Sequence, residues 1–402
     1  MKSNTKFISL FLCGCIAVII IFYVCLCFYL NHGYLGLSYN DFNAHWLVRA
    51  RAIGFQPLSP DGKLITAPTV PWALIVGQIF YAGFMPLHQA QIFNTLLHVI
   101  VYLFTAYLLY ELLKKDFDIT KIFILCLLPI AQFSFMYSLW FGNEGAIICL
   151  LMIDIILLMK KHPYIAGIIL SVCMSKPQIA AIFCVMVIIL SKNNYGGGGI
   201  KSIIIAAIID LSAWFTAAAI NNISMVNLLS ECFNVGADDA GYFYLGLLHV
   251  LRFAGVSKNI VLALNILIAV IFMLVLYKYL KKNLRSEKLF YFAAYVPVCV
   301  ASTMYMYKNG CDYLILIYPA AFFMILCMNE KISRQDFNLS VLCTGYLLLS
   351  RCLVYAGVVL HRTNLARGIY KGIDSLIIMI IGVILCKLVV KYQEIFRCSE
   401  IK

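Results

Sequence analysis

Long runs of apolar residues alternate with short clusters of charged residues along the whole chain. Most runs hold about 20 residues, the length of helix that crosses the hydrocarbon core of a bilayer. We therefore expect an all-α polytopic membrane protein of about 10 to 12 transmembrane helices, with residues 1–402 forming a single integral membrane domain. The runs predict spans at residues 7–30, 90–112, 121–140, 144–160, 200–219, 258–280, 289–307, 312–328, 337–359 and 372–390.

Two apolar segments do not have the pattern of a simple span. Residues 70–87 are short and carry a proline near each end, so we expect them in the outer interface as part of an outer loop over residues 31–89. Residues 164–190 are interrupted by Lys176-Pro177. A proline inside a helix removes a hydrogen bond and clashes with the preceding turn. This segment is therefore predicted to be a re-entrant or broken helix pair around a polar tip.

The distribution of positive charge gives an orientation. With residues 164–190 re-entrant and the N-terminus inside, the inner segments contain 20 of the 31 Lys and Arg residues. This agrees with the excess of cations found in cytoplasmic loops. The outer face then receives two loops, residues 31–69 and residues 220–250.

Composition excludes several classes of function. Hydrophobic residues make up 63% of the chain and charged residues only 12%, whereas soluble domains have about 25% charged residues. A soluble enzyme is therefore excluded. Nucleic acid is also not an expected partner, because the net charge of +13 is spread among connecting loops and forms no patch. No His and Cys spacing resembles a zinc site, and no glycine-rich nucleotide motif is present.

The first outer loop gathers acidic, basic and aromatic residues directly after the first span. Its carboxylate Asp41 lies where the chain leaves the hydrocarbon. A carboxylate in this position avoids the cost of the bilayer centre and can take a proton from a hydroxyl presented from outside. An alternative is that Asp41 only caps an interfacial helix that begins at Phe42. Spacing alone leaves both interpretations open.

Five motifs follow one another along the chain: Asp41-Phe42-x-x-His45-Trp46, Ala67 to Trp72, Gly142-Asn143-Glu144, Ala166-Gly167 to Lys176-Pro177, and Asp312-Tyr313-Leu314 to Pro319. This ordered set resembles glycosyltransferase family 87, the polyprenyl-phosphate-mannose-dependent mannosyltransferases with the C-type membrane glycosyltransferase fold. The resemblance covers roughly residues 5 to 325. It implies that Asp41 is the catalytic base.

The reaction implied by this resemblance requires cations for the leaving phosphate and polar groups for the sugar or acceptor. Candidates for binding the donor phosphate are Arg49, Arg51, Lys176, Lys308 and Arg362. Candidates for binding the acceptor or the sugar are His45, Trp46, Asn143, Glu144, Asp312 and Tyr313. We expect no metal ligand and no separate cofactor, although help from a divalent metal is left open.

Several of these residues also have a purely structural interpretation. Lys176 would snorkel to water from a broken helix, and Glu144 or Asp312 would cap a helix. Tyr313 would be an aromatic residue at the headgroup level. Outside the motifs, His98 is expected to form an interhelical hydrogen bond.

Intramembrane acids are a separate question, because ionisable residues within spans are rare and often functional. Asp154 and Asp210 lie in apolar runs on the expected inner half of the membrane. We expect them to be structurally paired or protonated, since the outer site would be far away.

The sequence therefore predicts an inverting membrane glycosyltransferase. It would move a hexose, mannose by resemblance, from a polyprenyl-phosphate carrier to a glycan or glycolipid acceptor. The expected location is the plasma membrane, that is, the inner membrane of a bacterium. Membrane lipids would surround the protein, and its active site would face the outside of the cell. The alternatives are a flippase or transporter of lipid-linked saccharides, and a glycan polymerase or ligase.

Overall fold

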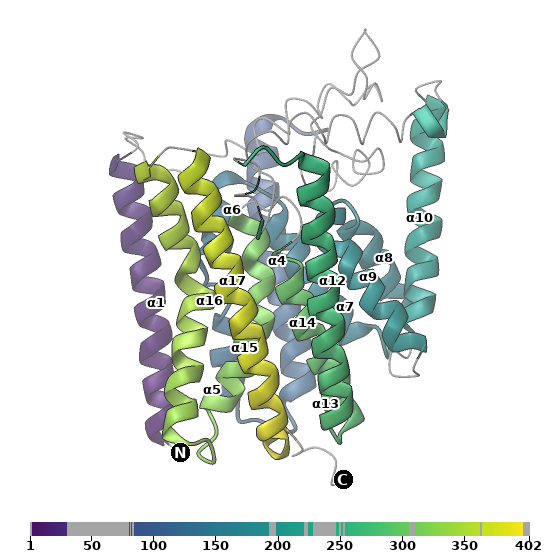
Figure 1. The fold of residues 1–402 in the computed structure, drawn as a ribbon. Helices are drawn as coiled ribbons and strands as arrows, with labels where there is room; N and C mark the ends of the chain where they lie inside the picture. The colour runs from purple at the N-terminus through teal and green to yellow at the C-terminus, as the bar shows by residue number, and fades with distance from the viewer. Residues whose placement is uncertain are drawn as a thin grey trace.

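The computed structural model describes residues 2–29, 80, 82, 84–192, 198–220, 224–227, 247–248, 251, 254–304, 310–361 and 364–396. Every regular element in these ranges is a helix (Figure 1). The α-helices are α1 (Lys2–Tyr29), α4 (Leu87–Leu113), α5 (Ile119–Leu127), α6 (Phe133–Phe141), α7 (Gly145–Leu158), α8 (Pro163–Cys173), α9 (Pro177–Lys192), α10 (Gly199–Ile220), α12 (Lys258–Asn283), α13 (Glu287–Ala293), α14 (Tyr295–Ala301), α15 (Ile317–Cys327), α16 (Arg334–His361) and α17 (Asn364–Lys391). The 3₁₀ helices are η4 (Gly310–Leu316) and η5 (Gln393–Phe396).

Several of these helices are long and apolar enough to cross a membrane. Among the described residues there are five, which lie in α1, α4, α10, α12 and α17. Large apolar side chains on their outer faces are exposed, for example Leu103 on α4, which is 58% exposed. Apolar surface of this extent on a folded protein is typical of contact with lipid. The predicted all-helical class is thus confirmed for the described residues, and their five long apolar helices are compatible with a polytopic membrane protein.

Proline divides two of the predicted spans into shorter helices. Residues 121–140 form α5 and α6, which are separated by a turn around Pro129. The predicted span 289–307 is described up to residue 304 and contains α13 and α14, which meet at Ala294, three residues before Pro297. In each segment proline has no backbone N–H to give to the carbonyl four residues earlier, and its ring clashes with that carbonyl. The prediction of one continuous helix was therefore wrong for both segments.

The segment with Lys176-Pro177 is divided into two helices, α8 and α9, and the chain turns back between them. The Oγ of Ser202, in the first turn of α10, donates to the carbonyl of Pro163, where α8 begins, at 2.9 Å. A Cβ added to Gly199 would lie 2.5 Å from the Oγ of Ser191, near the end of α9. The start of α8, the end of α9 and the start of α10 therefore lie together, so the chain turns back at Lys176.

Helix α7 is the centre of the core, and twelve of its residues are buried. It runs from the turn after α6 toward the end of the bundle where α1 begins and α17 ends (Figure 1). Its 14 residues have a length of about 21 Å. The turn between α6 and α7 is thus inside the bundle, well away from the end that holds the N-terminus.

Candidate functional site

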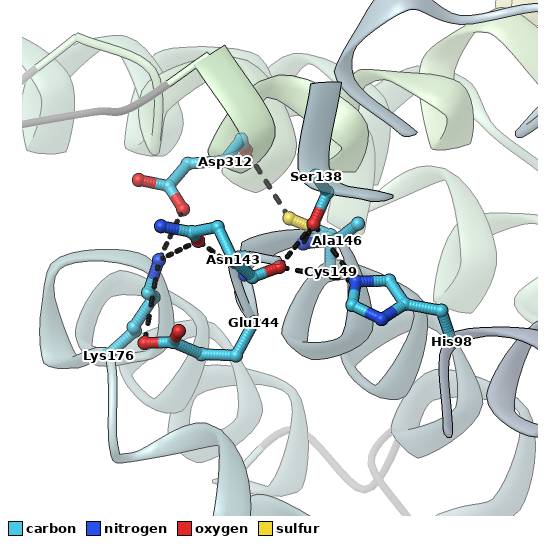
Figure 2. Close-up of polar contacts among 9 residues, drawn as sticks. His98, Ser138, Asn143, Glu144, Ala146, Cys149, Lys176 and Asp312 are labelled. Carbon is cyan, nitrogen blue, oxygen red and sulfur yellow. Dashed lines mark hydrogen bonds and ion pairs between the residues drawn. The ribbon is translucent and has the colours of Figure 1, made fainter. Parts of the chain in front are cut away.

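Three segments that are distant in the sequence meet at one buried polar cluster (Figure 2). They are the turn between α6 and α7, the break between α8 and α9, and the 3₁₀ helix η4. We call Asn143, Glu144, Lys176 and Asp312 the polar cluster. All four side chains are buried, with Asp312 0% exposed. Each of them was among the candidate residues predicted from the sequence.

Glycine shapes the turn that carries the first two members. Gly142 ends α6 with φ 65°, in the left-handed region that glycine adopts readily. The Oδ1 of Asn143 then accepts a hydrogen bond of 2.8 Å from the backbone N–H of Gly145, at the start of α7. The side chain of Glu144 makes no capping hydrogen bond there. The interpretation of Glu144 as the side-chain cap of this helix was therefore wrong, because Asn143 has that role.

Lys176 joins the three segments through its ammonium group. Its Nζ lies 3.0 Å from Asn143 Oδ1, 3.0 Å from Asp312 Oδ1 and 3.9 Å from Glu144 Oε1. The residue is only 7% exposed, so its ammonium is not directed to water. The snorkelling interpretation was wrong, because Pro177 ends the re-entrant turn inside the bundle and leaves Lys176 facing two carboxylates.

The charges of the polar cluster decide what it can do chemically. Two carboxylates surround one ammonium, so the cluster has a formal charge of −1 when all three groups are ionised. Carboxylate and amide oxygens accept hydrogen bonds from hydroxyl groups, and an ammonium donates to phosphate or hydroxyl oxygens. Among the residues that the structure describes, no three His, Cys, Asp or Glu side chains are arranged to hold a metal ion.

A histidine on α4 supports the turn from its other side. His98 is fully buried, and its Nδ1 lies 2.8 Å from the carbonyl oxygen of Asn94. Its Nε2 lies 3.1 Å from Ser138 Oγ on α6 and 3.2 Å from the carbonyl oxygen of Asn143. Ser138 also donates to this carbonyl. The predicted interhelical hydrogen bond of His98 is therefore confirmed, and it fixes the backbone that presents Asn143.

Tyr313 lies next to the polar cluster and contacts a second buried ion pair. The guanidinium carbon of Arg351 lies 3.6 Å from the centre of its ring. Arg351 forms an ion pair with Asp374, which also accepts a hydrogen bond of 2.9 Å from the Tyr346 hydroxyl. Tyr313 is only 4% exposed. Its interpretation as an interfacial aromatic was wrong, because Tyr313 is buried and its ring packs against Arg351 of α16.

Gln132 holds the backbone of η4 in place and was missed by the sequence analysis. It lies in the turn between α5 and α6 and is fully buried. Its Nε2 donates to the carbonyl of Tyr313 at 2.9 Å and to that of Leu347 at 3.1 Å. The sequence did contain a signal for this role, because Gln132 follows Pro129 by three residues. A helix broken by proline leaves backbone groups that need polar partners, and an amide side chain nearby can supply one.

The two intramembrane acids lie apart from the polar cluster. Asp210 on α10 accepts a hydrogen bond of 2.7 Å from Ser171 on α8, so its structural pairing is confirmed. Asp154 is fully buried in α7, nine residues after the first residue of that helix. Asp154 therefore lies more than two helical turns away from the turn that carries Asn143 and Glu144.

Seven predicted site residues lie outside the described residues, as do most of the loops predicted at 31–69 and 220–250. They are Asp41, His45, Trp46, Arg49, Arg51, Lys308 and Arg362. The polar cluster therefore contains Asn143, Glu144, Lys176 and Asp312 from the predicted set, with Tyr313 beside it. Comparison of the chain with models of protein families, with curated proteins and with solved structures found no match.

Proposed function

We propose that the chain is a membrane glycosyltransferase of the C type that uses a polyprenyl-phosphate-linked hexose as its donor. Mannose is the proposed sugar because of the motif resemblance, and a glycan or glycolipid is the proposed acceptor. One observation supports this proposal above the others. The elements Gly142-Asn143-Glu144, Lys176-Pro177 and Asp312-Tyr313, which were selected for their resemblance, converge in one buried cluster although up to 136 residues separate two hydrogen-bonded partners.

The depth of the cluster suits a substrate carried by a lipid. Helix α7 places it about 21 Å from the end of the bundle that holds the N-terminus, compared with a hydrocarbon core of about 30 Å. If that end is cytoplasmic, as the charge distribution predicts, the cluster lies in the outer half of the membrane. A polyprenyl tail would remain in lipid while its sugar phosphate reaches this depth from the outer interface. The proposed location is the plasma membrane of a bacterium.

The proposed reaction is a single displacement at the anomeric carbon. The acceptor hydroxyl gives its proton to Asp41 and its oxygen forms the new bond to the sugar, while the bond to the polyprenyl phosphate breaks and the phosphate leaves with the electron pair. This inverts the anomeric configuration. Glu144 and Asp312 would accept hydrogen bonds from sugar or acceptor hydroxyls, and Lys176 with the cations of the outer loops would bind the phosphate.

Transfer of radiolabelled sugar tests the proposal. The purified full chain, in lipid vesicles, is incubated with polyprenyl-phosphate-linked mannose, glucose or arabinose and an extract of membrane glycolipids as acceptor. We expect transfer from the mannose donor, at least a 100-fold loss in Asp41→Asn, and a loss in Asp312→Asn, which removes a charged hydrogen-bond acceptor from the proposed sugar site. The matched control is Glu111→Gln, which removes an exposed carboxylate on α4 and should transfer at the wild-type rate. Equal transfer by Asp41→Asn would remove this residue from the role of base.

The same vesicles separate this proposal from the transporter alternative. Movement of the intact lipid-linked sugar across the bilayer without transfer would favour a flippase and would contradict the proposal. Orientation is tested with single cysteines introduced at residues 62 and 196, labelled from either side of the membrane. We expect residue 62 to react from outside and residue 196 from the cytoplasmic side. The reverse pattern would place the proposed site on the wrong face.

A further inference from the structure

An apolar cavity lies at the other end of the bundle from the polar cluster. It has a volume of about 160 Å³ and lies between α4, α5, α7, α13, α15 and η5. Two helices face each other across it with residues spaced four apart, so each wall extends about 12 Å along the helix axis. These residues are Thr105, Leu109 and Leu113 on α4, and Ile317, Ala321 and Ile325 on α15.

The polar groups in the walls are satisfied by the protein itself. The hydroxyl of Thr105 donates to the carbonyl of Val101 at 3.0 Å, and that of Tyr318 donates to the carbonyl of Phe292 at 2.9 Å. A buried water needs about two to four polar partners, and an apolar cavity of about 150 Å³ stays dry and accepts a molecule of the size of benzene. The interior therefore suits a hydrocarbon segment of about six to eight carbon atoms.

Charged residues are confined to the mouth of the cavity. Lys288, the first-turn residue of α13, and Asp116, after α4, line it there. The neighbouring end of α12 adds Lys281 and Lys282, and Arg285 follows directly. This end is thus rich in cations, and near a bilayer surface each Lys or Arg attracts anionic lipid by about 1 kcal/mol.

We propose that this cavity binds one acyl chain of an anionic phospholipid, whose phosphate lies near Lys288. The narrow apolar walls fit an unbranched chain that enters from the headgroup end. The cations at the mouth select the negative headgroup. The site is separate from the polar cluster and requires no sugar substrate.

Photo-crosslinking tests this site directly. The full chain is reconstituted in phosphatidylcholine nanodiscs with a small fraction of phosphatidylglycerol that carries a diazirine at about the sixth carbon of one acyl chain. After irradiation, labelled peptides are located by mass spectrometry. We expect label on the cavity residues of α4 and α15. Absence of label from these segments would overturn the proposal.

Variants separate the cavity from general contact with lipid. Ala321→Phe places a ring between the two walls and should lower the cavity label at least fivefold. Leu103→Phe places the same ring on the exposed face of α4 and should leave the cavity label unchanged. Unchanged label in Ala321→Phe would contradict the proposal. If this variant does not fold, Ala321→Val together with competition by unlabelled phosphatidylglycerol tests the same prediction, and failure to compete would contradict it.

The headgroup is tested with a second lipid. Phosphatidylcholine that carries the same diazirine should label the cavity several-fold less than phosphatidylglycerol, and Lys288→Gln should reduce this difference. Equal labelling by the two lipids in the wild-type protein would contradict the proposed selection of an anionic headgroup.

Discussion

The buried ion pair between Lys176 and Asp312 allows a stability prediction whose size depends on burial. The two groups lie 3.0 Å apart, and their side chains are only 9% and 1% exposed. Removal of one partner of a buried pair leaves an uncompensated charge and costs about 3–5 kcal/mol. In Lys176→Met the carboxylates of Asp312 and Glu144 would both lose their shared cation. We expect this variant to be strongly destabilised.

An exposed ion pair in the same chain provides the control. Lys114 and Glu111 are only 2.6 Å apart, but their side chains are 39% and 40% exposed. Exposed pairs contribute about 0–1 kcal/mol because water screens both charges. Lys114→Met should therefore change stability little, although its ion pair is shorter. Distance alone would rank the two variants in the opposite order.

Thermal unfolding in detergent measures this difference. Most cysteines in the described part of the chain are buried, so a thiol-reactive dye reports unfolding. At about 2 °C per kcal/mol, Lys176→Met should lower the Tm by about 6–10 °C and Lys114→Met by less than about 2 °C. In Lys176→Met with Asp312→Asn, the loss should be smaller than the sum of the single losses. Equal Tm values for Lys176→Met and Lys114→Met, or strict additivity, would refute the reasoning.

Three further predictions concern packing, pH and backbone support, each followed by thermal unfolding. Gly167→Ala should lower the free energy of unfolding by about 1–3 kcal/mol, because the added Cβ would lie 2.8 Å from atoms of α10. The control Gly14→Ala, whose added Cβ would have nothing within 4 Å, should leave the stability unchanged. Equal Tm values for the two variants would contradict this prediction. The hydrogen bond from Lys391 lowers the pKa of Asp336, so Asp336→Asn should lower the free energy of unfolding by up to about 1 kcal/mol at pH 7. This loss of stability should disappear as the pH falls below about 4 through the lowered pKa, because the wild-type carboxylate is then protonated as well. A loss that persists at low pH would contradict the assignment. Gln132→Leu should cost about 1–3 kcal/mol, since two backbone carbonyls lose their donor; an unchanged Tm would show that these bonds contribute little.

The class of fold followed from the sequence alone. A helix that crosses a bilayer needs about 20 apolar residues because its backbone must satisfy its own hydrogen bonds in lipid. Run length and the scarcity of charge therefore indicated helices and membrane together. Proline marked the re-entrant segment at Lys176-Pro177 for an equally local reason. The same rule, applied to Pro129 and Pro297, would also have predicted the breaks in α5–α6 and α13–α14.

Tertiary structure decided which polar residues meet. Hydropathy describes each helix separately, and Lys176 and Asp312 are 136 positions apart. Local patterns suggested that Lys176 snorkels and that Glu144 caps a helix, because both outcomes are common for such residues near helix ends. Packing of the α8–α9 turn against α7 and η4 instead excluded water from Lys176. A buried ammonium then requires carboxylates within reach, and only the folded bundle brings Glu144 and Asp312 to it.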